Sequence, residues 1–356
     1  MNTNQKIEKV KEILKNHQKI ALAFSGGADS TLLAYLAKEV DCDVLAITYD
    51  NQIFPSGFLE FAKKRASELG VRHKIIENNF LDMEEDIVNN TPQRCLVCRR
   101  LMYGAIKQLA NEEGYEIIID GNNITDLTHD RPGILMKYEF EIKSPFIEAE
   151  LETYEIHQYL DEKNIEYSKS TTCLATRVMT NETVTIDKVN RIDYCESFIK
   201  SVTNSKTAKL RESNNVATVE LDNIGIALER KRIESIVTEL QLAQYDKILF
   251  NFNVNKKDER LIEENELDIG ANNLILRKKL PFGINISETA KILEDKKDEH
   301  VKNIESFEDI GYIKLNIDGK ESKIFKDGKI SIENNETIDD AKESLVKILP
   351  LIRRTV

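Results

Sequence analysis

Three short segments of the chain carry residue types that could do chemistry on a nucleotide or hold a metal. The first is SGGADS at residues 25–30, which follows an apolar run typical of a strand and precedes a run with helical spacing. Glycines in such a turn let backbone amides approach phosphate oxygens, and the helix N-terminus adds partial positive charge. The other two segments carry Cys95 and Cys98 at CxxC spacing, and Cys173 in STTCLATRV.

The side chains of the glycine-rich loop suit phosphate and Mg²⁺. Its hydroxyl groups can donate hydrogen bonds, and the carboxylate of Asp29 can cap amides or help to hold Mg²⁺. The loop lacks the lysine of the GxxxxGK[ST] phosphate loop, so it is a different nucleotide motif. We expect contacts to ATP from Ser25, Gly26, Gly27, Asp29, Ser30 and Thr31.

The cysteines leave two kinds of site open. A CxxC pair such as Cys95 and Cys98 is either two ligands of a metal site or a redox couple. Cys173 precedes Arg177, a basic group that would favour a thiolate. We expect Cys42 and Cys195 to be buried packing residues.

Around these segments, strand-like runs alternate with runs of helical spacing over the first 170 residues. This alternation predicts an α/β fold with a doubly wound parallel sheet. The later pattern predicts a smaller α+β domain and then a C-terminal α+β module. The predicted domains are residues 1–178, 179–255 and 256–356. Among the predicted elements are a helix over 99–114, a strand over 116–121 and a hairpin turn at Asn214–Asn215.

Composition limits the classes of partner. The 356 residues include 50 basic and 62 acidic side chains, for a net charge of −12. This excess of acid argues against a large nucleic-acid-binding face. The N-terminal segment lacks the apolar core of a signal peptide, and no apolar run approaches the length of a membrane span. We therefore expect a cytoplasmic protein without membrane contact.

Beyond these derivations, SGGADS resembles the PP-loop of the N-type ATP pyrophosphatases, which split ATP into AMP and pyrophosphate. The whole pattern resembles the LarE family of ATP-dependent sulfur transferases. Four segments carry this resemblance, in the family's order and spacing. They are SGGADS (25–30), PQRCLVCRR (92–100), DGNNITDLTHDRPG (120–133) with SPF (144–146), and CLATR (173–177).

The LarE resemblance implies a two-stage reaction. A carboxylate of a pyridinium dicarboxylate mononucleotide is adenylated with ATP and Mg²⁺, and sulfur then displaces AMP. In one branch of the family a single cysteine, at the position of Cys173, gives up its own sulfur. In another branch three cysteines ligate a [4Fe–4S] cluster that binds a hydrosulfide. Because Cys95, Cys98 and Cys173 are all present here, we prefer the cluster branch to a sacrificial Cys173 and to a zinc or purely structural site.

The resemblance also assigns roles to individual residues. It places adenine against backbone groups of Ala46–Tyr49 and gives Cys173, Asp29 and Arg177 catalytic roles. Further residues are implied to line the nucleotide or substrate pocket, and these are Tyr49, Arg99, Asp126, Thr176, Glu196 and Arg211.

Four functions compete at this point. A sulfur transferase acting on a small nucleotide, with sulfide or another sulfur donor, accounts for the PP-loop and the cysteines together. A tRNA thiolase would use the same motifs, but the acidic C-terminal region disfavours RNA. An amide-forming synthetase has no use for three cysteines, and a non-enzymatic cluster carrier has no use for an intact PP-loop. The family also suggests a homo-oligomer.

Overall fold

The structure is a computed structural model, and it describes residues 1–168, 172–222, 225, 229–251, 260–269, 274–297 and 300–355. The chain divides into two compact units, and each combines segments that are distant in sequence. The first unit comprises Lys19–Ile118 and Ile165–Lys257. The second comprises Met1–Gln18, Ile119–Asn164 and Asp258–Val356. The expected division into three consecutive domains stays a prediction.

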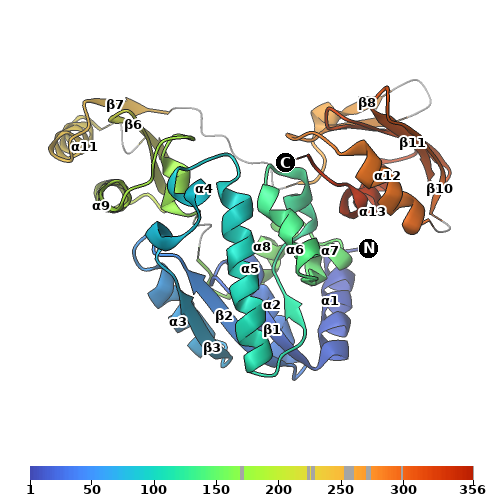
Figure 1. Cartoon of the computed structure of the whole chain (residues 1–356), viewed down its shortest axis with the longest axis horizontal. Helices are drawn as coiled ribbons and strands as arrows, with labels where there is room; N and C mark the ends of the chain where they lie inside the picture. Colours follow the sequence, from blue (N-terminus) through green and yellow to red (C-terminus); the bar gives the residue numbers. More distant parts are fainter. Residues whose placement is uncertain are drawn as a thin grey trace. The chain divides into compact units, whose positions relative to one another are not determined.

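The first unit is built on a parallel sheet with strand order β3-β2-β1-β4. Figure 1 shows β1, β2 and β3 side by side, with β2 pairing in parallel with both neighbours. The interior residues of β1 and β2 are buried without alternation, as in parallel sheets that are covered on both faces. This sheet confirms the predicted doubly wound α/β fold. The strands are β1 (Lys19–Ala23), β2 (Asp43–Asp50), β3 (Arg72–Glu77) and β4 (Ile118–Ile119).

Helices connect these strands, as the sequence alternation requires. They include α2 (Ala28–Glu39), α3 (Phe58–Glu68), α4 (Glu85–Val88) and α5 (Arg94–Glu112), with the short helix η1 (Phe80–Asp82). Helix α2 follows β1 and α3 follows β2, so each crossover returns the chain to a parallel neighbour.

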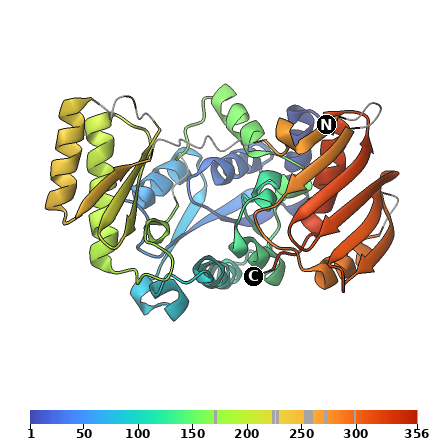
Figure 2. The same cartoon turned by 90° about the horizontal axis from the view of Figure 1, so that it is seen from above.

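A smaller α+β region completes the first unit. Its three-stranded sheet has the order β5-β6-β7, and α9 and α11 lie side by side next to it (Figure 2). The hairpin between β5 and β6 turns at Asn214 and Asn215, both with positive φ, which asparagine tolerates. The elements are η4 (Leu174–Arg177), α9 (Ile186–Thr203), β5 (Ala208–Ser213), β6 (Val216–Leu221), α11 (Arg230–Leu242) and β7 (Lys247–Phe250).

The second unit combines the N-terminal helix, a central helical segment and a C-terminal antiparallel sheet. The sheet has strand order β10-β11-β12-β13-β9-β8, and its strands alternate buried and more exposed residues. Its elements outside the sheet are α1 (Thr3–His17), η2 (Ile124–Thr128), η3 (Pro132–Leu135), α6 (Met136–Glu139), α7 (Pro145–Glu148), α8 (Thr153–Glu162), η5 (Glu264–Glu266), α12 (Ile286–Asp295), α13 (Ile338–Ile348) and η6 (Leu349–Leu351). The strands are β8 (Leu267–Ile269), β9 (Leu274–Lys279), β10 (Val301–Phe307), β11 (Tyr312–Ile317), β12 (Lys320–Phe325) and β13 (Lys329–Asn335).

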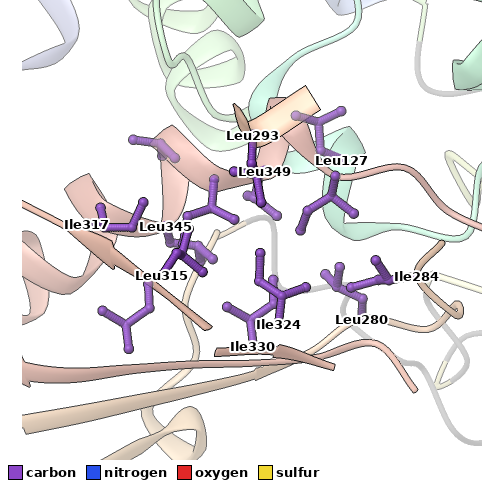
Figure 3. Close-up of a cluster of buried hydrophobic side chains, with 14 of the residues drawn as sticks. Leu127, Leu280, Ile284, Leu293, Leu315, Ile317, Ile324, Ile330, Leu345 and Leu349 are labelled. Carbon is purple, nitrogen blue, oxygen red and sulfur yellow. The ribbon is translucent and has the colours of Figure 1, made fainter. Parts of the chain in front are cut away.

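The C-terminal sheet shares one hydrophobic core with the central helical segment. Figure 3 shows Leu127 of η2 and Leu349 of η6 in the same cluster as Leu315, Ile324 and Ile330 of the sheet. All five side chains are less than a tenth exposed. Burial of apolar surface therefore joins the C-terminal strands to residues some two hundred positions earlier in the chain.

Buried ion pairs reinforce the same unit. Lys6 of α1 and Glu155 of α8 pair at 2.8 Å, with side chains only 5% and 4% exposed. The fully buried carboxylate of Glu152 accepts the backbone N–H of Leu261 at 2.8 Å and pairs with Lys342 of α13. A buried charge is tolerated only with such compensation, so these contacts bind the segments into one unit.

Across the part of the chain that the structure describes, no helix is both long and apolar enough to cross a membrane.

Replacing Lys6 with alanine should destabilise the protein far more than replacing Lys11 of the same helix. Loss of Lys6 leaves the buried Glu155 carboxylate without its cation, which costs about 3–5 kcal/mol. Lys11 pairs with Glu8, whose side chain is 66% exposed, and such a pair contributes about 0–1 kcal/mol. Urea unfolding of the two variants measures both changes. Equal losses of unfolding free energy would contradict this assignment.

Candidate functional site

The segment Ser25–Ser30 forms the turn from β1 into α2. Helix α2 begins at Ala28 with Gly27 as its N-cap, so the first-turn amides lack partners within the helix. Gly26 adopts a φ of +70°, where a side chain would be strained. Asp29 lies in the first turn of α2, as the sequence predicted. The turn therefore has the backbone geometry of an anion site at a helix N-terminus.

Hydroxyl groups fix the shape of this loop. Ser30 Oγ accepts the backbone N–H of Ser25 at 3.2 Å and donates to the Gly27 carbonyl at 3.3 Å. The Gly27 N–H donates to Ser25 Oγ at 3.3 Å. Thr31 Oγ1 is buried and has no hydrogen-bond partner among the described residues. The serines thus order the loop, and Thr31 keeps a hydroxyl available for a ligand.

The CxxC pair lies in the first turn of a helix. The sequence pattern placed the start of this helix at residue 99, whereas α5 begins at Arg94. Cys95 and Cys98 are therefore three residues apart on one helical face. Both thiols are free and partly exposed.

The third thiol comes from a short turn packed beside the end of β2. Cys173 is the N-cap of η4, and the next residue, Leu174, donates its N–H to the Ile53 carbonyl at 2.7 Å. Leu174 is fully buried in a cluster with Ile53 and Ile192 of α9. Arg94 Nη1 donates to the Ala175 carbonyl at 3.1 Å, which joins this turn to the start of α5.

Burial and neighbouring thiols raise the pKa values of Cys98 and Cys173. Burial, together with Cys173 and Cys95, raises the pKa of the Cys98 thiol to about 11, although Arg99 and Asn51 act in the opposite direction. The pKa of the Cys173 thiol is also raised, because burial outweighs the lowering effect of the nearby Arg94 guanidinium. Without further positive charge, Cys98 is therefore protonated at neutral pH.

Two of the three sulfurs have an N–H donor. Arg94 Nη2 donates to Cys95 Sγ at 3.2 Å, and Asn51 Nδ2 donates to Cys98 Sγ at 3.5 Å. At Cys173 the backbone N–H of Thr176 donates to the carbonyl oxygen of the same residue at 3.1 Å, which shapes the turn. The Asn51 donor opposes part of the rise in the Cys98 pKa that burial causes.

Arg177, predicted as catalytic, is held by a buried ion pair. Its Nε donates to Glu196 Oε1 at 2.6 Å, and both side chains are 4% exposed. Its Nη1 donates to the hydroxyls of Thr176 and Thr172 at 2.8 and 2.6 Å. Glu196 also accepts the N–H of Leu210 on β5. Glu196 therefore orients the guanidinium next to the Cys173 turn.

Two other predicted basic residues occupy different settings. Arg211 of β5 pairs with Glu220 at 2.7 Å and donates to the Thr176 carbonyl at 3.3 Å, so it borders the same turn. Arg99 of α5 packs over the ring of Tyr103, with 5.4 Å between guanidinium and ring centroid. That Arg211 and Arg99 contact the substrate stays a prediction.

The remaining predicted residues are buried. Tyr49 lies near the end of β2, and its hydroxyl accepts a hydrogen bond from Asn78 at 3.0 Å. Asp126 belongs to the second unit, where it pairs with Arg131 and accepts the N–H of Asn123 at 3.1 Å. Asp126 thus caps η2, and its predicted place near the nucleotide is not tested by these contacts.

Three residues of the site escaped the sequence analysis. Asn51 follows β2 directly. Ligands bind at the carboxyl ends of parallel strands, so its position in the sequence could have predicted a place in the site. Arg94 adjoins Cys95 but precedes the recognisable helical pattern, and Asn90 lies in a loop without a motif. Cys42 and Cys195 are buried away from solvent, as predicted for packing residues.

Within the described ranges, no three His, Cys, Asp or Glu side chains already form a group that could hold a metal ion. The metal interpretation of the thiols is thus supported only by the chemistry of the donors, and it stays a prediction.

Comparisons with known proteins agree with the PP-loop interpretation of the glycine-rich segment. A model of the PP-loop domain matches residues 1–137. An uncharacterized protein of Methanocaldococcus jannaschii is 28% identical over 69% of this chain and 93% of its own length. The pyridinium-3,5-bisthiocarboxylic acid mononucleotide synthase of Lactiplantibacillus plantarum is 27% identical over 58% of this chain and 76% of that enzyme.

A probable tRNA sulfurtransferase of Methanothermobacter thermautotrophicus is 29% identical, over 36% of this chain and 36% of its own length. The similarity to this protein covers only about a third of either chain. The resemblance to PP-loop sulfur transferases that the sequence indicated is confirmed.

Replacing Gly26 with alanine should destabilise the protein more than replacing Gly57. Both glycines have positive φ, which costs an alanine roughly 1–2 kcal/mol. A Cβ at Gly26 would also lie 3.2 Å from the Phe61 ring and 3.3 Å from Ala62 Cα, whereas nothing described lies within 4 Å at Gly57. We expect about 1–3 kcal/mol of additional loss in urea unfolding. Indistinguishable variants would show that the loop has room for a side chain.

Proposed function

Because a model of the PP-loop domain matches residues 1–137, we propose that the protein is an AMP-forming, ATP-dependent sulfur transferase. Its proposed substrate is a small nucleotide with a carboxylate, similar to a pyridinium dicarboxylate mononucleotide. One observation supports this most strongly: a single compact unit contains the PP-loop and three thiols, Cys95, Cys98 and Cys173. The PP-loop accounts for activation, and the thiols favour sulfur over nitrogen as the displacing atom.

In the first stage, the loop binds ATP. Amides of Gly26, Gly27 and the first turn of α2 bind phosphate oxygens, and the Thr31 hydroxyl adds a donor. Asp29 helps to hold Mg²⁺. A carboxylate oxygen of the substrate attacks the α-phosphorus, the bond to pyrophosphate breaks, and an acyl adenylate forms.

In the second stage, sulfur replaces AMP. A hydrosulfide attacks the carbonyl carbon, the carbon–oxygen bond to AMP breaks, and AMP leaves with the electron pair. The product is a thiocarboxylate. Burial raises the pKa of the Cys173 thiol, and the guanidinium groups of Arg94 and Arg177 offset part of that rise.

We further propose that Cys95, Cys98 and Cys173 hold a [4Fe–4S] cluster. The donor set suits such a cluster chemically, because thiolates ligate its irons, and three ligands leave one iron open to a hydrosulfide. Hydrogen bonds to ligand sulfurs help to set the properties of such clusters, and Arg94 and Asn51 supply two of them here.

Two alternatives share the same activation step. In one, Cys173 gives up its own sulfur and is left as dehydroalanine, so Cys95 and Cys98 have no role in transfer. In the other, the acceptor is tRNA, which the similarity to the probable tRNA sulfurtransferase favours. The broader similarity to the mononucleotide synthase favours a small acceptor.

Replacing Cys95 with serine should remove both iron and sulfur transfer, because the cluster loses a ligand. Wild-type protein purified without oxygen should contain about four irons per chain, as expected for one [4Fe–4S] cluster. Asp29→Asn is the matched control: it should retain iron but release no pyrophosphate, because Asp29 lies in the PP-loop turn. Iron, sulfide and pyrophosphate analyses measure these outcomes.

Other results would favour the alternatives. Activity that survives Cys95→Ser in iron-free protein, with loss of H₂S from Cys173 after turnover, would support the sacrificial cysteine. Incorporation of labelled sulfide into tRNA, and none into the mononucleotide, would support tRNA thiolation.

A further inference from the structure

The three thiols lie on two chain segments, and a small set of polar contacts joins these segments. We infer that Asn90 and Arg94 are positioning residues that hold the Cys173 turn against the first turn of α5 and so bring the three sulfurs together. The importance of this role rests on the proposed function. The contacts themselves concern only the geometry of the two segments.

Asn90 is fully buried between the segments. Its side-chain amide donates to the carbonyls of Val178 and Met179 at 3.0 and 2.9 Å, and its own carbonyl accepts the N–H of Asn181 at 3.0 Å. Its φ of +53° is in the left-handed region, which costs most residues roughly 1–2 kcal/mol and which asparagine tolerates better. Such a backbone persists only where surrounding contacts maintain it.

Arg94 contacts both segments with one planar group. Its Nη1 donates to the Ala175 carbonyl at 3.1 Å and to the side-chain oxygen of Asn90. Its Nη2 donates to Cys95 Sγ at 3.2 Å. A guanidinium can make these bonds in different directions at once, whereas a lysine ammonium is a single point donor. Arg94 therefore joins a thiol, the Cys173 turn and the buried asparagine.

The guanidinium of Arg94 makes its hydrogen bonds at this junction. Its hydrogen-bond partners among the described residues are a carbonyl, an amide oxygen and a sulfur, and none is a carboxylate. Its Nε is buried and unpartnered within the same set of residues. Within the described part of the chain, the hydrogen bonds of Arg94 therefore all lie at the junction between the two thiol-bearing segments.

Backbone contacts support the same junction but leave room for a test. The N–H of Val184 donates to the Val88 carbonyl at 2.8 Å, and that of Leu174 donates to Ile53 at 2.7 Å. These bonds do not involve the side chains of Asn90 or Arg94. Loss of either side chain should thus loosen the junction without unfolding the unit.

Thiol cross-linking measures the junction directly. The full-length chain is treated with a chelator without oxygen, reacted with the bifunctional thiol reagent dibromobimane, and mapped by mass spectrometry. The Cys95–Cys98 link lies within α5 and serves as the internal reference. In Arg94→Gln and Asn90→Ala, the yield of cross-links from Cys173 to Cys95 or Cys98 should fall severalfold relative to that reference. Buried Cys42 and Cys195 should stay unmodified in folded protein.

Matched controls separate positioning from general stability. Asn89→Ala and Arg100→Gln change exposed neighbours of the same residue types and should leave the link ratio at the wild-type value. Arg94→Lys should restore only part of the ratio. If folded Arg94→Gln keeps the wild-type ratio of Cys173 links to the Cys95–Cys98 link, the inference is wrong. If Asn90→Ala does not fold, the Arg94→Gln and Arg94→Lys variants still test it. If the cross-links depend on Arg94 but the wild-type protein transfers no sulfur, the inference stands and only the proposed function is contradicted.

Discussion

The guanidinium of Arg94 is in contact with both segments that carry the thiols, and the proposed chemistry depends on that contact. One side of the group meets Cys95 in the first turn of α5, and the other meets the backbone of the Cys173 turn. Its remaining hydrogen bond among the described residues is to the side-chain oxygen of the buried Asn90. One planar group therefore connects both thiol-bearing segments and the asparagine between them.

The parallel sheet explains why these groups meet in one region of the first unit. The PP-loop follows β1, and Asn51, which donates to Cys98, follows the adjacent parallel strand β2. Carboxyl ends of neighbouring parallel strands lie at one edge of a sheet, so short loops there converge on a ligand. The smaller α+β region contributes the anchor for Cys173, because Leu174 and Ile192 share its core with Ile53. The second unit is held by its own core and by the buried pair of Lys6 and Glu155.

Local sequence patterns predicted much of this structure. The PP-loop turn, the order of strands and helices and the asparagine hairpin turn all follow from residue spacing and turn chemistry, and each is observed. Helix α5 starts earlier than predicted, at Arg94, because the CxxC segment in its first turn has no clear helical period in the sequence. Strand β4 is shorter than the predicted strand over 116–121, since only Ile118–Ile119 is assigned to it. The pairing of Arg177 with Glu196 and the discontinuous units depend on long-range contacts, which local patterns do not encode.

The most direct test of the central claim is the product of one turnover. Wild-type protein, ATP, Mg²⁺, hydrosulfide and a pyridinium dicarboxylate mononucleotide are combined without oxygen, and the nucleotides are analysed by mass spectrometry. The account predicts a product in which one carboxylate oxygen is replaced by sulfur, with one AMP and one pyrophosphate formed for each replacement. Release of ADP and phosphate, or AMP formation with the carboxylate unchanged while hydrosulfide is present, would contradict it.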